Sequence, residues 1–175
     1  MSTSTRPFAV LLGVLFMILA GRLAFSIGIG DLNIPITGQT LAVLLIGYYC
    51  RSVEILLIFM IYLGSGSLGA PVFAEGEAGL QHLTGKSGGY LYSFPLGAWL
   101  VCRYRSHGGV SLRLLVLFVL ATALILLIGM LHLSSHIGIG ASYTYGVQPY
   151  LAGGFVKCLL ALAFIFVVDR FLDWY

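Results

Sequence analysis

The feature that most constrains this chain is an unbroken apolar stretch, LLVLFVLATALILLIGML, which fills residues 114–131 without a charged side chain. A helix of about 20 such residues matches the hydrocarbon core of a bilayer. The whole chain shares this character, because 59% of its 175 residues are hydrophobic and 9% are charged. Soluble domains carry about 25% charged residues. The sequence therefore predicts an all-α integral membrane protein.

Charge balance and cysteine spacing exclude other classes of protein. Nine Lys and Arg against six acidic residues is too small an excess for nucleic acid to be a plausible partner. Cys50, Cys102 and Cys158 lie far apart and form no CxxC pair, so neither a zinc site nor a disulfide framework is expected. His132 and His136 have helical spacing but no acidic neighbour, and we expect no metal and no cofactor.

Glycine- and proline-rich stretches divide the chain into apolar blocks. We expect one domain over residues 1–175, with six transmembrane helices. The helices are expected at about 7–27, 39–50, 52–68, 88–104, 110–133 and 148–170. The first block also resembles a signal peptide, but the charge layout favours a transmembrane helix. The stretch SIGIGDLNIPITG, which includes Asn33, is expected to be extended or re-entrant.

The basic residues predict the orientation of these helices. Six arginines fall on the N-terminal side of the membrane: Arg6, Arg51, Arg103, Arg105, Arg113 and Arg170. Arg22 and Lys86 fall on the opposite side, so the positive-inside rule predicts that both termini are cytoplasmic. Three irregular stretches, at about 26–38, 71–86 and 134–149, then share the external side. Irregular backbone at membrane depth must line protein or a wet cavity, so we expect these stretches to form an outward-facing ligand pocket.

The loop sequence PVFAEGEAGLQHLTGKSGGY contains two motifs of catalytic type. Gly85-Lys86-Ser87 matches only the end of a P-loop, since position 80 is Leu where that motif needs Gly. The same stretch spells GxSG, which a rhomboid-type intramembrane hydrolase uses with a serine nucleophile, here Ser87. A serine needs a base, and the expected sixth helix contains no His. We expect no catalytic residue, and the hydrolase remains an alternative.

A few polar side chains sit in apolar surroundings. Lys157 lies within the expected sixth helix, where an ammonium group either faces a cavity or snorkels to the interface. An unpaired cation there invites a carboxylate ligand. Arg22 is expected to be an interfacial anchor, with pairing to Asp31 as the alternative. Gln39 and Asn33 supply amides suited to a neutral ligand with donors and acceptors.

Aromatic and small residues suggest two further contacts. Rings near the outer rim, among them Phe73, Tyr90 and Tyr150, fit an interfacial belt or stacking on a flat ligand. On the first helix Ala9, Gly13, Ala20 and Ala24 have small-xxx-small spacing. This spacing permits close packing, either within the bundle or against another membrane protein.

Three blocks of sequence together resemble the BioY family. They are IPITGQTLAVLLIG at 34–47, YLGSGSLGAPVFAEGEAGLQHLTGKSGGYLYSFPLGAWLV at 62–101, and PYLAGGFVKCLLA at 149–161. BioY proteins are the biotin-binding S components of energy-coupling factor (ECF) vitamin transporters. The resemblance implies a six-helix S-component-like bundle in a bacterial plasma membrane that captures biotin from outside. It also implies a transmembrane coupling subunit and an ATPase pair as partners, so ATP hydrolysis would belong to other chains.

The resemblance assigns roles to individual positions. Carried over, the ligand positions are Gln39, Gly79, Gly88, Gly89, Tyr90, Gly153 and Lys157, with Lys157 facing the biotin carboxylate or the polar network of the site. We add Phe73, Glu75 and Tyr150 to this set, and we expect Ala9, Gly13 and Ala20 to contact the coupling subunit. Another small vitamin as ligand, a scaffold without ligand, and a homodimer remain open.

The chain departs from the family pattern at three places, one of which is Glu75-Gly76, where the family has Gly-Gly after PVF. The family motif PGDxxK carries an acid where this chain has Gly154, and the motif PTGGY begins with a proline where this chain has Lys86. A substitute acid would come from Glu75 or Glu77 if the loop folds inward. Otherwise the two residues lie in a solvated loop.

Overall fold

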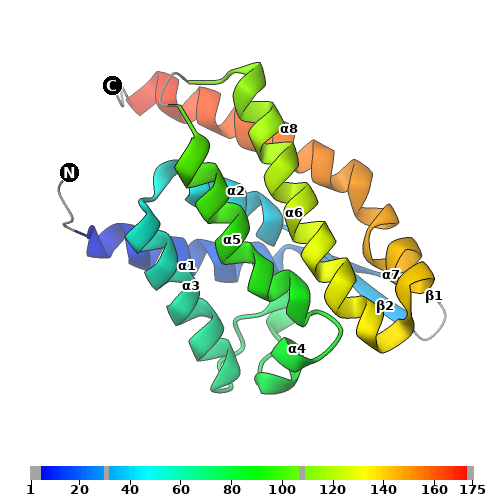
Figure 1. The fold of residues 1–175 in the computed structure, drawn as a ribbon. Coiled ribbons are helices and arrows are strands. Elements are labelled where there is room, and N and C mark those ends of the chain that lie inside the picture. Colours follow the sequence, from blue (N-terminus) through cyan, green and yellow to red (C-terminus); the bar gives the residue numbers. More distant parts are fainter. Residues whose placement is uncertain (1–4, 30–31, 107–108, 173–175) are drawn as a thin grey trace.

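The structure is a computed structural model that describes residues 5–29, 32–106 and 109–172. Six long helices form a bundle (Figure 1). They are α1 (Pro7–Arg22), α2 (Gln39–Tyr49), α3 (Ser52–Ser67), α5 (Gly88–Tyr104), α6 (Leu112–Ile137) and α8 (Gln148–Leu172). The connections contain β1 (Ala24–Ile29), β2 (Leu32–Thr37), the 3₁₀ turn η1 (Ala74–Gly76), α4 (Leu80–Thr84) and α7 (Ile139–Gly146). The expected helical bundle is confirmed.

Local signals account for several helix ends. Pro7 begins α1 at the first helical position, where its missing N–H leaves no hydrogen bond unmade. The Ser111 hydroxyl caps α6 by accepting from the Leu114 N–H at 3.2 Å. Gly138 ends the same helix with φ of 81°, a conformation that glycine adopts without steric strain. The helix α6 thus runs four residues beyond its expected end.

A β-hairpin replaces the last residues expected for the first helix. β1 pairs antiparallel with β2, with Ala24 opposite Thr37 and Ile29 opposite Leu32. The N–H of Gly38 closes the base of the hairpin by donating to the carbonyls of Ala20 and Leu23. The helix α1 therefore stops at Arg22 and not near residue 27, and the stretch expected to be extended is a strand pair. Asp31 and the side chain of Asn33 lie outside the described residues.

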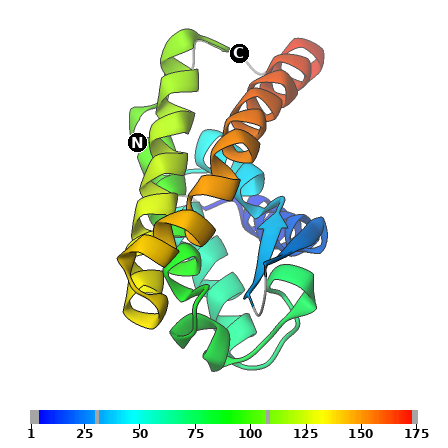
Figure 2. The same cartoon turned by 90° about the vertical axis from the view of Figure 1, so that its right-hand side faces the viewer.

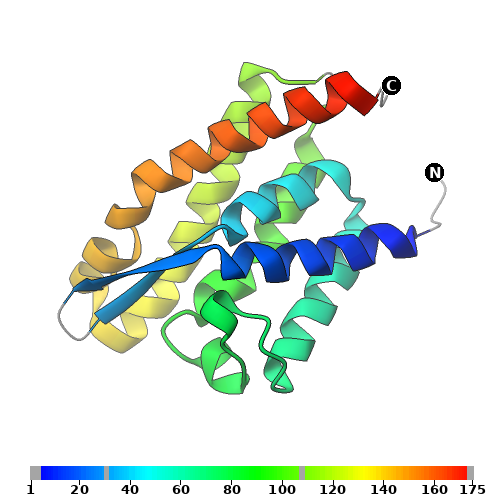
Figure 3. The same ribbon diagram turned by 180° about the vertical axis from the view of Figure 1, so that it is seen from behind.

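The described bundle has two distinct ends. Both termini lie at one end, together with the α2–α3 turn and the connection from α5 to α6 (Figures 1 and 3). The hairpin, α4 and α7 lie at the opposite end, which Figure 2 faces. By length and composition α6 and the Ile139–Phe171 segment can each cross a membrane, and α1, α2 and α3 are shorter apolar helices.

Large apolar side chains fill the interior and also cover the outside. One buried cluster joins α1, α3 and the 71–86 loop through Met17, Ile58 and Phe73. A second joins α2, α6 and α8, with Phe118 and Ile165 at its centre. Outward faces carry exposed apolar residues on every long helix except α2, among them Leu15, Met60, Trp99, Leu120 and Phe166. Such extensive apolar surface fits a chain whose surroundings are lipid.

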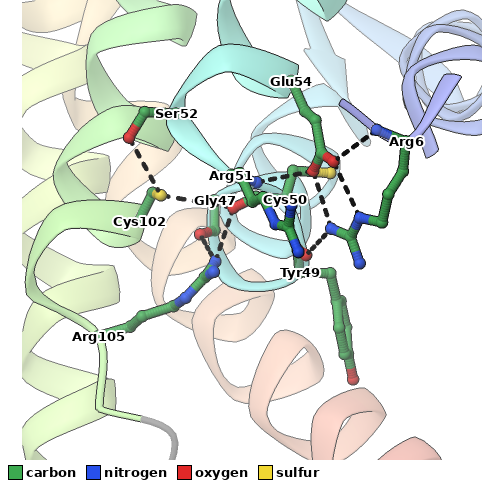
Figure 4. Close-up of polar contacts among 9 residues, drawn as sticks. All are labelled: Arg6, Gly47, Tyr49, Cys50, Arg51, Ser52, Glu54, Cys102 and Arg105. Atoms are coloured by element: carbon green, nitrogen blue, oxygen red, sulfur yellow. Dashed lines mark hydrogen bonds and ion pairs between the residues drawn. The ribbon is translucent and has the colours of Figure 1, made fainter. Parts of the chain in front are cut away.

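The carboxylate of Glu54 is the centre of the polar contacts at the end with the termini (Figure 4). Glu54 is fully buried, and it accepts from the Arg6 Nε at 2.9 Å and from the Arg6 Nη2 at 2.8 Å. It also accepts from the backbone N–H groups of Arg6 and Arg51. This hydrogen bonding raises the pKa of Arg6. The pair ties the start of α1 to the start of α3.

Arginines also satisfy the carbonyl groups that end α2 (Figure 4). Arg105 donates through Nη1 to the carbonyls of Gly47 and Cys50, and Arg6 donates through Nη2 to the carbonyl of Tyr49 at 3.1 Å. The last carbonyls of a helix have no partner within it, so these donors replace the missing bonds. Burial lowers the pKa of Arg105.

We expect Arg6→Ala to lower the free energy of unfolding by about 3 kcal/mol, because it leaves Glu54 as a buried, unpaired carboxylate. Denaturant unfolding in detergent micelles measures this change. Arg103→Ala is the matched control, because the Arg103 guanidinium lies over the Tyr104 ring and holds no carboxylate in the described part of the chain. Equal losses for the two variants would contradict the role given to Arg6.

Candidate ligand-binding site

A cavity of about 160 Å³ opens at the end that holds the hairpin, α4 and α7. Its walls come from the end of β2, the start of α2, the 71–86 loop, α4, α5, α6, α7 and the start of α8. A cavity that holds a single water has a volume of about 10–15 Å³, so this one is large enough for a small organic molecule. The expected pocket shared by three irregular stretches is confirmed.

One wall of the cavity carries a fixed amide. The Gln39 side chain is only 3% exposed, and its Nε2 donates to the hydroxyl of Tyr62. Its Oε1 accepts from the Thr37 hydroxyl at 3.1 Å. Gly21 lets α1 approach closely, since a Cβ there would lie 3.2 Å from the Gln39 Nε2. We call Thr37, Gln39 and Thr40 the amide wall; it holds Gln39 in place and leaves its second amide N–H for a ligand.

Aromatic rings form the facing surfaces. Tyr90 and Tyr150 line the cavity with ring centroids 6.3 Å apart, and the Tyr90 hydroxyl donates to the carbonyl of Gly146 at 2.7 Å. That hydroxyl is therefore engaged, and Tyr90 offers the cavity its ring. Phe73 also lines the cavity and packs edge-on against Tyr62 at 5.6 Å.

Ionisable side chains border the cavity on the loop side. Glu77, His82 and Lys86 all line it, and we call them the charged rim. The His82 Nδ1 lies 2.8 Å from the Glu77 Oε2. Of the two loop acids, Glu77 reaches the cavity, whereas Glu75 lies in η1 with φ of 56° and is not among the lining residues.

Three of the glycines proposed as ligand positions do not line the cavity, and each has a role in the fold. Gly79 turns the loop with φ of 101° and donates its N–H to the carbonyl of Gly66 at 2.8 Å. A Cβ on Gly88 would overlap the carbonyl of Leu83, and one on Gly89 would overlap the side chain of His132. The Gly-Gly pair thus brings α5 against α4 and α6.

Lys157 and Gly153 lie on α8 outside the cavity lining. The nearest lining residue on this helix is Tyr150, seven positions earlier, which is about 10 Å along a helix axis. Lys157 is half-buried and forms no ion pair within residues 5–29, 32–106 and 109–172. At Gly154 an added Cβ would lie 3.1 Å from the Thr122 Cγ2, so α8 approaches α6 where the family carries its acid.

The small residues of α1 mostly face inward. A Cβ on Gly13 would overlap Ile58 of α3, and Ala20 is buried beside Gly38. Both positions therefore pack closely within the chain, although Gly13 also lines a groove on the surface. Ala9 lines an apolar groove between α1, α2 and α8. The spacing serves internal packing at two of the three positions expected to contact a coupling subunit.

Several lining residues and one loop contact were not predicted from the sequence. Thr37 and Thr40 flank Gln39 in the ITGQT block, and this spacing was the available signal. No signal in the sequence distinguished His82 from a solvent-exposed histidine without a role in the site. Arg22 donates to the carbonyl of Pro71 at 2.7 Å, so it fastens the loop to α1 and is more than an interfacial anchor.

Ser87 lines the cavity but lacks the arrangement of a nucleophile. Across the described residues no histidine hydrogen-bonds its hydroxyl, and the His132 Nε2 lies 3.0 Å from the carbonyl of Gly85. A serine without a base within reach is a weak nucleophile. The site therefore has the features of a binding pocket, with polar, aromatic and charged walls.

Comparison with known proteins identifies the family. Residues 1–173 match the BioY family model, and the chain belongs to the BioY family. It is 32% identical over 137 residues to the probable biotin transporter BioY of Pyrococcus horikoshii, covering 78% of this chain and 80% of that one. It is 27% identical over 167 residues to the biotin transporter BioY2 of Lactococcus lactis subsp. cremoris, covering 94% and 90%.

A solved structure shares the fold. The crystal structure of the S-component for biotin from an ECF-type ABC transporter matches with a TM-score of 0.80 at 20% identity. The match covers 94% of this chain and 89% of that one. The chain therefore shares this fold, and its membership of the BioY family gives it a membrane location; the hydrolase and scaffold alternatives are set aside.

Alanine substitutions at Gly89 and Gly153 test whether close helix packing explains the Gly-Gly motif. We expect Gly89→Ala to lower the free energy of unfolding by about 1–3 kcal/mol, because the new methyl group forces α5 away from α6. Gly153→Ala should leave stability unchanged or raise it by up to about 1 kcal/mol, since no heavy atom lies within 4 Å of its added Cβ and alanine favours a helix. Thermal unfolding of both variants measures the difference, and a stable Gly89→Ala protein would contradict the packing role.

Proposed function

We propose that this chain captures biotin and moves it across the membrane as the substrate-binding S component of an ECF transporter. The observation that carries this proposal is a cavity with an amide wall, aromatic surfaces and a charged rim, within a chain of the BioY family. The names of its relatives support biotin as the ligand.

The chemistry of biotin is complementary to this cavity. Its ureido group has two N–H donors and one carbonyl acceptor, which suit the amide and hydroxyl groups of Gln39, Thr37 and Thr40. Its fused ring and aliphatic chain suit the aromatic side chains of Tyr90 and Phe94. Both kinds of contact are required, since apolar walls give burial and a few polar groups give specificity.

The distribution of basic residues supports a multi-pass protein of the plasma membrane with cytoplasmic termini. Arg6, Arg51 and Arg105 lie together at the end that holds the termini (Figure 4), and Arg170 is in the last turn of α8. Under the positive-inside rule this is the cytoplasmic end. The cavity then opens outward, where biotin must be captured. A transmembrane coupling subunit and an ATPase pair would supply the energy, and Ala9 and Gly13, which line the apolar groove, stay the candidate contacts on α1.

Purified protein should be stabilised by biotin, because any ligand that binds only the folded state raises its stability. At a ligand concentration of 100 times Kd the gain is about 2.7 kcal/mol. Thermal unfolding in detergent with biotin, thiamine and riboflavin measures the effect and its selectivity. A larger shift with another vitamin would reassign the ligand, and no shift with biotin would refute the proposal.

Gln39→Leu should weaken biotin binding by about 1–3 kcal/mol, because it removes a buried hydrogen-bonding partner of the ureido group. Isothermal titration calorimetry measures the affinity. Gln81→Leu is the matched control, since Gln81 is exposed on α4 and does not line the cavity. Equal affinities for the two variants would remove Gln39 from the site.

A further inference from the structure

We propose that Lys86 is the specificity-determining cation of the cavity. It binds the ligand's carboxylate at the charged rim and so orients the ligand with its ureido group toward the amide wall. This inference rests on the proposed function, and it assigns to Lys86 the role that the family resemblance suggests for Lys157.

Position is the first reason. Among the cavity-lining residues Lys86 is the one Lys or Arg side chain in the described ranges. Lys157 lies outside the lining, about two helical turns beyond Tyr150. Arg22 is engaged with the carbonyl of Pro71. A carboxylate bound in this cavity therefore has Lys86 as its nearest fixed positive charge.

The ammonium group of Lys86 is also available. The acid that shares the charged rim, Glu77, lies against the His82 Nδ1 at 2.8 Å. No carboxylate pairs with Lys86 in the part of the chain that the structure describes. The side chain is exposed, so its ammonium reaches a ligand without losing an existing ion pair.

The backbone around Lys86 is held in place. The Gly85 N–H donates to the carbonyl of Gln81 at 2.8 Å, and the Gly88 N–H donates to the carbonyl of Gly85 at 3.0 Å. The His132 Nε2 contacts the same Gly85 carbonyl from α6 at 3.0 Å. Lys86 thus projects from an anchored turn at the edge of the cavity.

Desolvation decides which end of the ligand meets which wall. Gln39 is only 3% exposed, whereas Lys86 is exposed. Moving a carboxylate away from water costs far more free energy than moving a neutral ureido group. The charged group of the ligand therefore stays at the rim with Lys86, and the neutral group goes to the amide wall. Lys86 stands where the family motif has a proline, so this way of orienting the ligand is a feature of this chain and not of the family motif.

The test compares biotin with biotinamide, whose neutral carboxamide replaces the carboxylate. Affinities are measured for the full chain in detergent and for Lys86→Met, Lys86→Arg and Lys157→Met. We expect the unmodified chain to prefer biotin by about tenfold, as a charge-assisted hydrogen bond predicts. Lys86→Met should lose this preference through weaker biotin binding alone, and Lys86→Arg and Lys157→Met should keep it.

The salt dependence of the two affinities is a second test, and it needs only the unmodified chain. Exposed charge pairs are screened by ions, so raising salt from about 50 to about 500 mM should weaken biotin binding and leave biotinamide binding unchanged. Unchanged biotinamide affinity in Lys86→Met also shows that the cavity is intact.

The outcomes separate the two levels of the proposal. If the unmodified chain binds neither compound, the proposed function fails and this inference fails with it. If it binds both equally, or if the preference is lost in Lys157→Met and kept in Lys86→Met, biotin capture stands and the role of Lys86 is overturned.

Discussion

Every backbone N–H and C=O group inside a bilayer needs a partner within the protein, and this requirement shapes the whole chain. Helices meet it internally, so six helices make up the described bundle, and the irregular backbone lies at its two ends. The ends then differ in how they use their polar groups. At the end with the termini, Glu54 accepts four hydrogen bonds, and Arg105 satisfies the carbonyls that end α2.

The opposite end leaves polar groups available around a cavity. Gln39 uses one amide hydrogen and its carbonyl oxygen to fix its own position, and its remaining N–H has no partner among the described residues. Tyr90 uses its hydroxyl on Gly146 and presents a ring. At one end of the bundle the polar side chains mainly bond to other parts of the chain, and at the other some hydrogen-bonding groups face a cavity.

The positions of the helices could be predicted from the sequence, because apolar runs form helices and glycine and proline end them through local effects. The sequence also indicated Gln39, Phe73, Tyr90 and Tyr150, which do line the cavity. The sequence does not distinguish a glycine beside a ligand from a glycine between two helices, because in both places the close approach leaves no room for a Cβ. Gly88 and Gly89 belong to the second kind. The sequence predicts that Lys157 lies within a membrane helix. Its distance from the cavity depends on how α8 packs against the other helices, which the sequence does not show. His82 becomes notable only when the loop brings it to Glu77.

The loop between α3 and α5 is fastened from three helices. Arg22 of α1 holds Pro71, Gly66 of α3 accepts from Gly79, and His132 of α6 contacts Gly85. Ordering a residue costs about 1–2 kcal/mol of conformational entropy. In this chain that cost is met when the protein folds, so it is not subtracted from the free energy of each binding event. A small molecule with few atoms can then be held tightly, because its contacts do not also have to order the loop around it.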